Sequence, residues 1–207
     1  MKPTLVALDV QHAFRPKPFQ NDRGAVFTMR DGTHVAESDL AMKYAHAARD
    51  AILSRVPRST VVMNDPSKQQ LVGRYSDRAA WARAHQVDIY IACHVNAGGG
   101  NGSRTYSADH GQMGPVDTES AVLALTISDN LGDGRRGVTL HRGERGWPCI
   151  GLVPSPILAV MVEPFFGDHA GELALFSTDS GARVIGHGIA NAIGSYLYVS
   201  GTPGGRP

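Results

Sequence analysis

Short apolar runs alternate along this chain with longer segments of helical periodicity. Four runs are short and rich in β-branched residues, which is typical of buried strands. They cover Thr4 to Val10, Ser59 to Met63, Val87 to Cys93 and Ile157 to Val162. Strands that are separated by helices predict an α/β fold, with a mostly parallel twisted sheet and helices on both faces.

The clearest helical segment runs from Glu37 to Val56, where apolar residues recur at helical spacing until Pro57 ends the pattern. Three further helices are expected at Arg74 to His85, Asp117 to Leu131 and Gly181 to Leu197. Loops are expected at Phe14 to Gly32, Gly98 to Gly102 and Arg142 to Pro156. Along the chain, the four predicted strands alternate with the four predicted helices.

The length of 207 residues suits one domain, because a single core can bury most of the apolar surface of such a chain. We expect this domain at residues 1–199. The last residues, 200–207, contain several Gly and Pro and are expected to form a flexible tail. The two cysteines are too few for a disulfide framework or a four-cysteine zinc site.

Charge and hydropathy exclude two classes of partner. The net charge of +1 provides no excess of basic residues for phosphate contacts, so no nucleic-acid partner is expected. No apolar stretch reaches the roughly 20 residues that span a bilayer, so no membrane partner is expected. The N-terminal segment MKPTLVALDV is too short and too polar for a secretion signal, which predicts synthesis in the cytoplasm.

Three of the four apolar runs end beside a residue that can bind a metal or transfer a proton. The first run leads to His12, the third to His94 and the fourth to Glu163. Since the carboxyl ends of parallel strands lie along one edge of a sheet, we expect these side chains to lie close together. Glu37 is expected beside them, because it begins the helix after the first strand, where a carboxylate is stabilised.

Two imidazoles and one carboxylate are the ligand set of a catalytic zinc ion that keeps a fourth position open. Any one of these histidines or glutamates alone would more often have a structural role than a functional one. Their expected convergence favours a functional site. We predict that His12, Glu37 and His94 bind Zn2+ at the carboxyl ends of the strands. A zinc hydrolase also needs a proton-transferring group that is not a ligand, and Glu163 is the best candidate, because a buried carboxylate is costly unless it is paired or functional.

Together these segments resemble the zinc-dependent N-acetylmuramoyl-L-alanine amidases of the Amidase_3 type. LVALDVQH, at residues 5–12, is similar to the family's strand that ends in D-x-G-H. IYIACHVNAG, at residues 89–98, is similar to its S-I-H-x-N-A segment, and VMVEPFFGD, at residues 160–168, to its L-V-E-x-G-F segment. The sequence departs from the family where Gln11 replaces the Gly before the first His, and where Ala13 and Phe14 replace the Gly-Gly after it.

The resemblance implies that His12, Glu37 and His94 are the zinc ligands and that Glu163 is the catalytic acid and base. It also implies that residues 1–199 are an amidase catalytic domain whose partner is bacterial peptidoglycan. A monomeric lysin of phage type is the expected kind of protein, made in the cytoplasm and acting on the cell wall after release. Two alternatives remain open: a zinc carboxypeptidase-like peptidoglycan hydrolase, and a cell-wall-binding module without activity.

Overall fold

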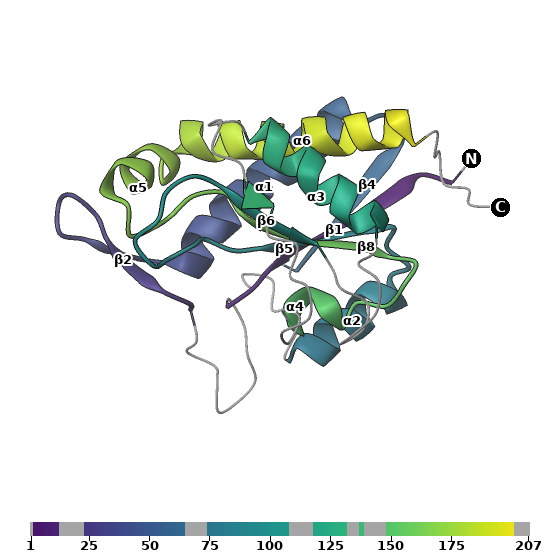
Figure 1. Ribbon diagram of the computed structural model, residues 1–207, viewed down its shortest axis with the longest axis horizontal. Helices are drawn as coiled ribbons and strands as arrows, with labels where there is room; N and C mark the ends of the chain where they lie inside the picture. The colour runs from purple at the N-terminus through teal and green to yellow at the C-terminus, as the bar shows by residue number, and fades with distance from the viewer. Residues whose placement is uncertain are drawn as a thin grey trace.

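A six-stranded sheet forms the centre of the computed structural model (Figure 1), which describes residues 2–12, 23–64, 74–107, 118–131, 137–138 and 148–200. The strand order is β4 (Ser59–Asn64), β1 (Thr4–Val10), β5 (Ile89–Cys93), β8 (Leu158–Glu163), β6 (Arg104–Ser107) and β7 (Gly137–Val138). β1 pairs in parallel with both β4 and β5, and β5 pairs in parallel with β8. β6 runs antiparallel to β8 and parallel to β7. The predicted α/β fold with a mostly parallel sheet is confirmed.

Helices cover both faces of this sheet (Figure 1). The helices are α1 (Glu37–Arg55), α2 (Tyr75–Ala84), α3 (Thr118–Asn130), α4 (Pro148–Gly151), α5 (Ala170–Phe176) and α6 (Asp179–Val199). α1, α3 and α6 share one apolar core with one face of the sheet, and α2 and α4 share a second core with the other face. Among the described residues, no helix is both long enough and apolar enough to cross a membrane.

The four predicted strands and four predicted helices are confirmed with boundaries within two residues. The strands β6 and β7 were missed, because the RTYS sequence of β6 has no apolar run and β7 has only two residues. α5 was missed because its seven residues are shorter than the window in which helical periodicity can be recognised.

Two segments that were predicted as loops contain regular structure. In the predicted loop from Phe14 to Gly32, β2 (Val26–Thr28) pairs antiparallel with β3 (His34–Ala36), and residues 13–22 lie outside the described part. In the predicted loop from Arg142 to Pro156, α4 begins at Pro148, and residues 139–147 are not described. The predictions of loops were wrong at these places because the elements are too short to show a period. The tail at residues 201–207 lies outside the described residues, so its prediction is untested.

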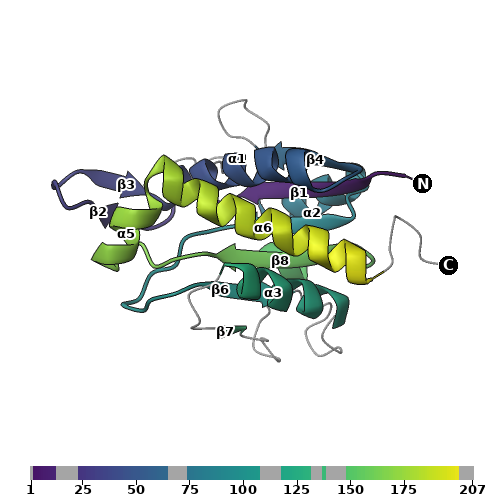
Figure 2. The ribbon, with the colours of Figure 1, turned by 90° about the horizontal axis from the view of Figure 1, so that it is seen from above.

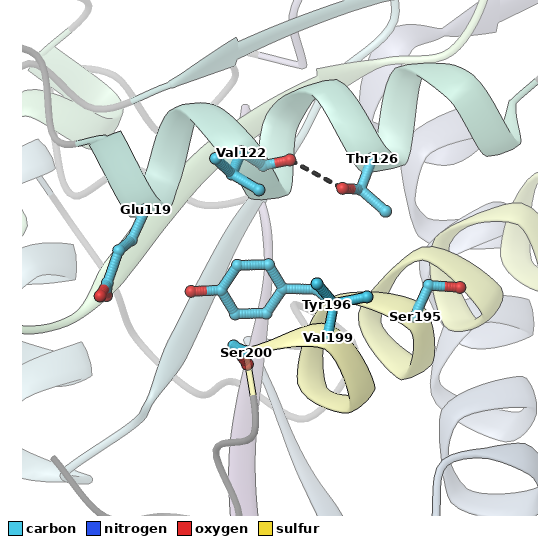
Figure 3. A pocket seen from close by; sticks show the side chains of 7 residues that line it. All are labelled: Glu119, Val122, Thr126, Ser195, Tyr196, Val199 and Ser200. Atoms are coloured by element: carbon cyan, nitrogen blue, oxygen red, sulfur yellow. Dashed lines mark hydrogen bonds between the residues drawn. The ribbon is translucent and has the colours of Figure 1, made fainter.

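A groove of about 390 Å³ lies between α3 and α6 (Figure 3). Its lining residues are Glu119, Val122, Thr126, Ser195, Tyr196, Val199 and Ser200. Figures 1 and 2 place this end of α6 near the beginning of β1, at the amino ends of the parallel strands. None of the predicted site residues lines this groove.

α6 packs closely on α1 because one of its glycines faces the α1 backbone. Figure 2 shows α6 lying between α1 and α3 above the sheet. A Cβ atom at Gly186 would lie 2.5 Å from the carbonyl carbon of Ala47 and 2.6 Å from the amide nitrogen of Ala48. Helix backbones cannot shift as a flexible side chain can, so the position excludes any side chain.

We expect Gly186→Ala to destabilise the protein by about 1–3 kcal/mol, because the added methyl group overlaps the α1 backbone. The matched control is Gly194→Ala in the same helix, where the nearest atom to a Cβ lies at 3.9 Å. That variant should be more stable than the parent by up to about 1 kcal/mol, since Ala favours a helix over Gly. Urea unfolding measures both free energies, and equal stability of the two variants would contradict the close packing.

Candidate metal centre

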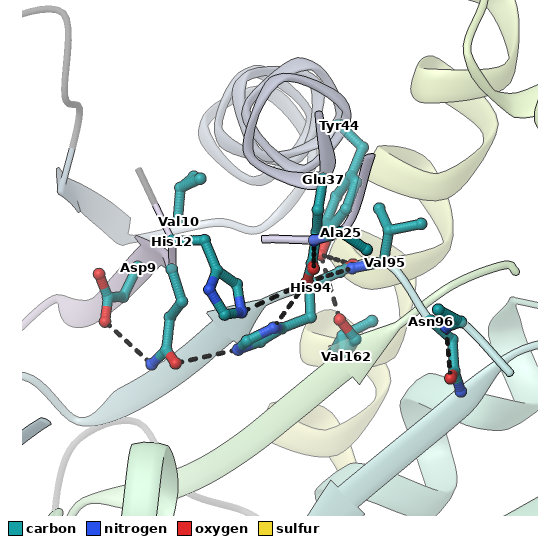
Figure 4. Close-up of polar contacts among 12 residues, drawn as sticks. Asp9, Val10, His12, Ala25, Glu37, Tyr44, His94, Val95, Asn96 and Val162 are labelled. Carbon is teal, nitrogen blue, oxygen red and sulfur yellow. Dashed lines mark hydrogen bonds and ion pairs between the residues drawn. The ribbon is translucent and has the colours of Figure 1, made fainter. Parts of the chain in front are cut away.

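The side chains of His12, Glu37 and His94 converge beside the carboxyl ends of β1 and β5 (Figure 4). Nδ1 of His94 lies 2.9 Å from Oε1 of Glu37, and Nε2 of His12 lies 3.7 Å from the same oxygen. One ligand atom from each residue lies within 4.8 Å of the others. The convergence predicted from the strand ends and the helix start is confirmed.

Glu37 is held at this place by the segment that precedes α1. Its backbone N–H donates to the carbonyl of Ala25 at 2.8 Å, and the N–H of Ala25 donates to Oε2 of Glu37 at 3.1 Å. Gly24 has a φ of +76°, and a Cβ atom there would overlap the Glu37 carboxylate. The sequence did not indicate a role for Gly24, because this residue lies in a predicted loop whose contacts could not be predicted.

The two histidines reach the cluster from the ends of neighbouring strands. His94 follows β5 directly, and Tyr44 of α1 donates through its hydroxyl group to the carbonyls of His94, at 2.9 Å, and Val162, at 3.1 Å. His12 has a φ of 63°, in the left-handed region that costs a non-glycine residue about 1–2 kcal/mol. The two imidazole rings meet edge to face, with centroids 5.0 Å apart.

The charge state of Glu37 suits a metal ligand. Burial would raise the pKa of this carboxyl, but the hydrogen bond with His94 and the charges of His94 and His12 outweigh burial. The pKa therefore lies below its ordinary value, and the carboxylate is ionised at neutral pH. An ionised carboxylate with two imidazoles fits a divalent transition metal, and three protein ligands leave a further position for another ligand.

A buried ion pair lies behind the cluster, on the face of the sheet that α2 covers. Asp9 of β1 pairs with Arg78 of α2, and their side chains are 0% and 1% exposed. Asn64 and Tyr90 also donate hydrogen bonds to the Asp9 carboxylate. Burial alone would raise the pKa of Asp9, but Arg78 and these donors hold it below its ordinary value. Asp9 is thus an ionised acceptor at the end of β1.

Glu163 is the last residue of β8, and only 9% of its surface is exposed. Burial raises the pKa of its carboxyl, the nearby charge of Glu37 adds to the rise, and His94 partly offsets it. The Tyr106 phenol donates a hydrogen bond to Glu163, and Arg104 faces it across the β6–β8 pairing. Val162 of β8 is in register with Cys93 of β5, so Glu163 and His94 lie on adjacent strands at the carboxyl edge of the sheet, beside the candidate metal centre. Tyr106 and Arg104 were missed because β6 was not predicted.

The chain matches a known protein family over most of its length. The family model Amidase_3, described as N-acetylmuramoyl-L-alanine amidase, matches residues 6–195. The endolysin of Bacillus phage SPP1 is 26% identical over 179 residues, which are 83% of this chain. This chain spans only 62% of the length of that relative.

Solved structures show the same fold at low identity. The chain is similar to an N-acetylmuramoyl-L-alanine amidase from Clostridium difficile 630, with 21% identity and a TM-score of 0.73 over 96% of this chain and 98% of that one. It is also similar to the amidase Ami1 from Mycobacterium smegmatis, with 16% identity and a TM-score of 0.77 over 96% and 98% of the two chains. Since the family model matches residues 6–195, well over half of the chain, this chain belongs to the Amidase_3 family of N-acetylmuramoyl-L-alanine amidases.

Proposed function

We propose that this chain is a zinc-dependent hydrolase that cleaves the amide bond between N-acetylmuramic acid and L-alanine in peptidoglycan. The observation that carries this proposal is the convergence of His12, Glu37 and His94, with the buried Glu163 beside them. The membership of the chain in a family of amidases supports the choice of bond. The cluster lies at the carboxyl edge of a parallel sheet, which is where α/β proteins bind their ligands.

Zinc is the metal that this ligand set suits best, because two imidazoles and one carboxylate are the usual ligands of a catalytic zinc. When bound, zinc would polarise the scissile carbonyl and make a water molecule a stronger nucleophile. The chain itself contributes an ionised Glu37 and two imidazoles that follow β1 and β5, and their ligand atoms already lie within 4.8 Å of one another. These are residues of one chain, which supports action as a monomer.

Glu163 is proposed to transfer the proton. Its raised pKa, caused first by burial and then by the charge of Glu37, makes the carboxylate a stronger base than an exposed one. It removes a proton from the attacking water and donates one to the departing amine nitrogen. Burial and the adjacent Glu163 raise the pKa of Tyr106 to about 12, so the phenol keeps its proton and can orient the carboxylate through its hydrogen bond.

A phage-type lysin is the kind of amidase that we propose, with synthesis in the cytoplasm and action on the cell wall after release. The similarity to the endolysin of Bacillus phage SPP1 supports this proposal. The rival activity is that of a zinc carboxypeptidase, which would release amino acids from the end of the stem peptide. The non-catalytic alternative is a wall-binding module, and the burial of Glu163 argues against it.

Removal of the metal should abolish activity. A chelator is expected to stop the appearance of new L-alanine amino termini on purified peptidoglycan, and added zinc should restore it. His94→Ala should bind no zinc under the same conditions, whereas His34→Ala, an exposed histidine on β3, should bind it as the parent does. Elemental analysis measures the zinc. Activity that is insensitive to the chelator would disprove the proposal, and release of free amino acids alone would favour the carboxypeptidase.

Glu163→Gln should retain zinc and lose activity by a factor of about 10²–10⁴, because the amide keeps the shape of the side chain but cannot take a proton. Zinc content and the rate of formation of amino termini are measured on the same sample. The control is Glu119→Gln, an exposed glutamate on α3, which should be as active as the parent. If Glu163→Gln and His94→Ala both clear cell walls normally, the catalytic interpretation is wrong.

Gly24→Ala should weaken zinc binding, because its Cβ atom overlaps the Glu37 carboxylate and must displace it. The control is Gly32→Ala, since Gly32 has a φ of +85° but no atom within 4 Å of a Cβ position. Both variants introduce similar backbone strain, and only Gly24→Ala displaces a ligand. Competition with a chromophoric chelator measures the zinc dissociation constants, and equal constants for the two variants would contradict the role of Gly24.

A further inference from the structure

We propose that Arg104 is a specificity-determining residue that binds a carboxylate on the second residue of the stem peptide, the one that follows L-alanine. The inference rests on the proposed function, which places the scissile amide at the candidate metal centre. Arg104 is the first residue of β6 and is partly buried. It lies directly across the antiparallel β6–β8 pairing from Glu163, the proposed proton-transferring group.

The guanidinium group of Arg104 is held in place and still has donors to offer a ligand. Its Nη1 donates to the carbonyl of Ser103 at 3.0 Å, and its Cζ lies 5.7 Å from the centroid of the Phe166 ring. A guanidinium has five N–H donors, so one backbone carbonyl leaves most of them unused. Among the residues that the structure describes, no carboxylate forms an ion pair with Arg104. The group therefore suits two-point binding of a carboxylate.

The ring that supports the guanidinium is fixed by contacts of its own. Phe166 is buried, and its backbone N–H donates to Oε2 of Glu172 at 2.8 Å. The other carboxylate oxygen of Glu172 accepts from the N–H of Gly102, two residues before Arg104, at 2.6 Å. Gly100 lies against the ring, since a Cβ atom there would overlap it. Glu172 thus joins the segment before β6 to the segment after β8, and Arg104 rests on a fixed support.

The strand order indicates which part of the substrate reaches Arg104. Because β6 is antiparallel to β8, its first residue lies at the carboxyl edge of the parallel strands. Along this edge the order β1, β5, β8, β6 places His12, His94, Glu163 and Arg104 one after another. Glu163 is proposed to give its proton to the departing amine, so this amine lies on the Glu163 side of the metal centre. The amine belongs to L-alanine, and the peptide therefore continues past Glu163 toward Arg104.

The distance along the edge matches the second residue of the peptide. Neighbouring strands lie about 4.8 Å apart, so β6 is about 10 Å from β5, which His94 follows. An extended chain advances about 3.5 Å per residue, which places the residue after L-alanine about 7 Å from the scissile carbonyl. A charge-assisted N–H···O contact of about 2.8 Å covers the rest. A glutamate at this position with a free carboxylate fits, whereas its carboxamide form, isoglutamine, lacks the charge.

Arg104 also acts on Glu163 directly. Burial raises the pKa of the Glu163 carboxyl, and the positive charge of Arg104 partly offsets the rise. This electrostatic effect is the same for every substrate. Binding of a carboxylate, in contrast, favours only the substrates that carry one. Comparison of two substrates therefore separates the two roles.

The test uses two peptidoglycan fragments of two disaccharide units, with D-glutamate as the second stem residue in one and D-isoglutamine in the other. The zinc-loaded parent should cleave the glutamate fragment with a kcat/KM higher by a factor of about 10–100, which corresponds to a hydrogen bond to a charged group. Arg104→Met keeps an apolar stem over Phe166 without the charge. This variant should lose the preference, mainly through a higher KM for the glutamate fragment.

Two further variants sharpen the comparison. Arg104→Lys keeps the positive charge without the two-point geometry and should retain part of the preference. The matched control is Arg183→Met, which removes an exposed arginine on α6 and should leave the preference of the parent unchanged.

A parent that cleaves both fragments with the same kcat/KM would overturn the inference, and this result does not depend on any variant folding. An equal loss on both fragments in Arg104→Met would also overturn it, because Arg104 would then act only through Glu163. Calorimetry with zinc-loaded Glu163→Gln measures the binding preference without turnover. A parent that cleaves neither fragment would contradict the proposed function, while the preference in binding would still test Arg104.

Discussion

The parallel pairing of β1, β5 and β8 brings the residues of the candidate site to one edge of the sheet. Cys93 is in register with both Val10 and Val162, so the three strands end at nearly the same level. The residues that follow, among them His94 and Glu163, are therefore presented along one edge. Tyr44 strengthens this edge, because its hydroxyl contacts the carbonyls of two adjacent strand ends. A slip of one residue in either pairing would separate these groups, since it would send side chains to the opposite face.

The surroundings of Glu37 and Glu163 shift the pKa values of their carboxyl groups in opposite directions. Glu37 has a lowered pKa because the imidazoles of His94 and His12 outweigh its burial, which suits a metal ligand. Glu163 has a raised pKa because burial dominates and Glu37 repels its negative charge, which suits a group that takes and returns a proton. Because both residues are glutamates, the difference between their pKa values arises from their positions in the fold. A pair of carboxyl groups with divergent pKa values is a common arrangement for acid–base chemistry.

A second layer of polar residues lies behind the ligands and fixes their orientation. On one side, the Asp9–Arg78 ion pair anchors Gln11, which contacts His94. On the other, the backbone of Ala25, beside Gly24, holds the Glu37 carboxylate. These contacts join five segments of the chain: β1, α2, the residue after β5, the segment before α1, and α1 itself. The metal centre is therefore a product of the whole fold, and metal affinity should respond to changes at residues that never touch the ion.

The fold class, the four longest strands, the four long helices and the candidate ligands could be predicted from the sequence, because each depends on local periodicity or on a residue close to the end of a strand or the start of a helix. The sequence did not reveal β6, β7, α5 or the β2–β3 pairing, since these elements are too short to show a period. The contacts of Gly24 with Glu37, of Tyr106 with Glu163 and of Gln11 with His94 became known only from the folded chain. The physical reason is the same in each case: these contacts join residues that are distant in sequence, and their partners are set by strand order and register, which no local pattern encodes.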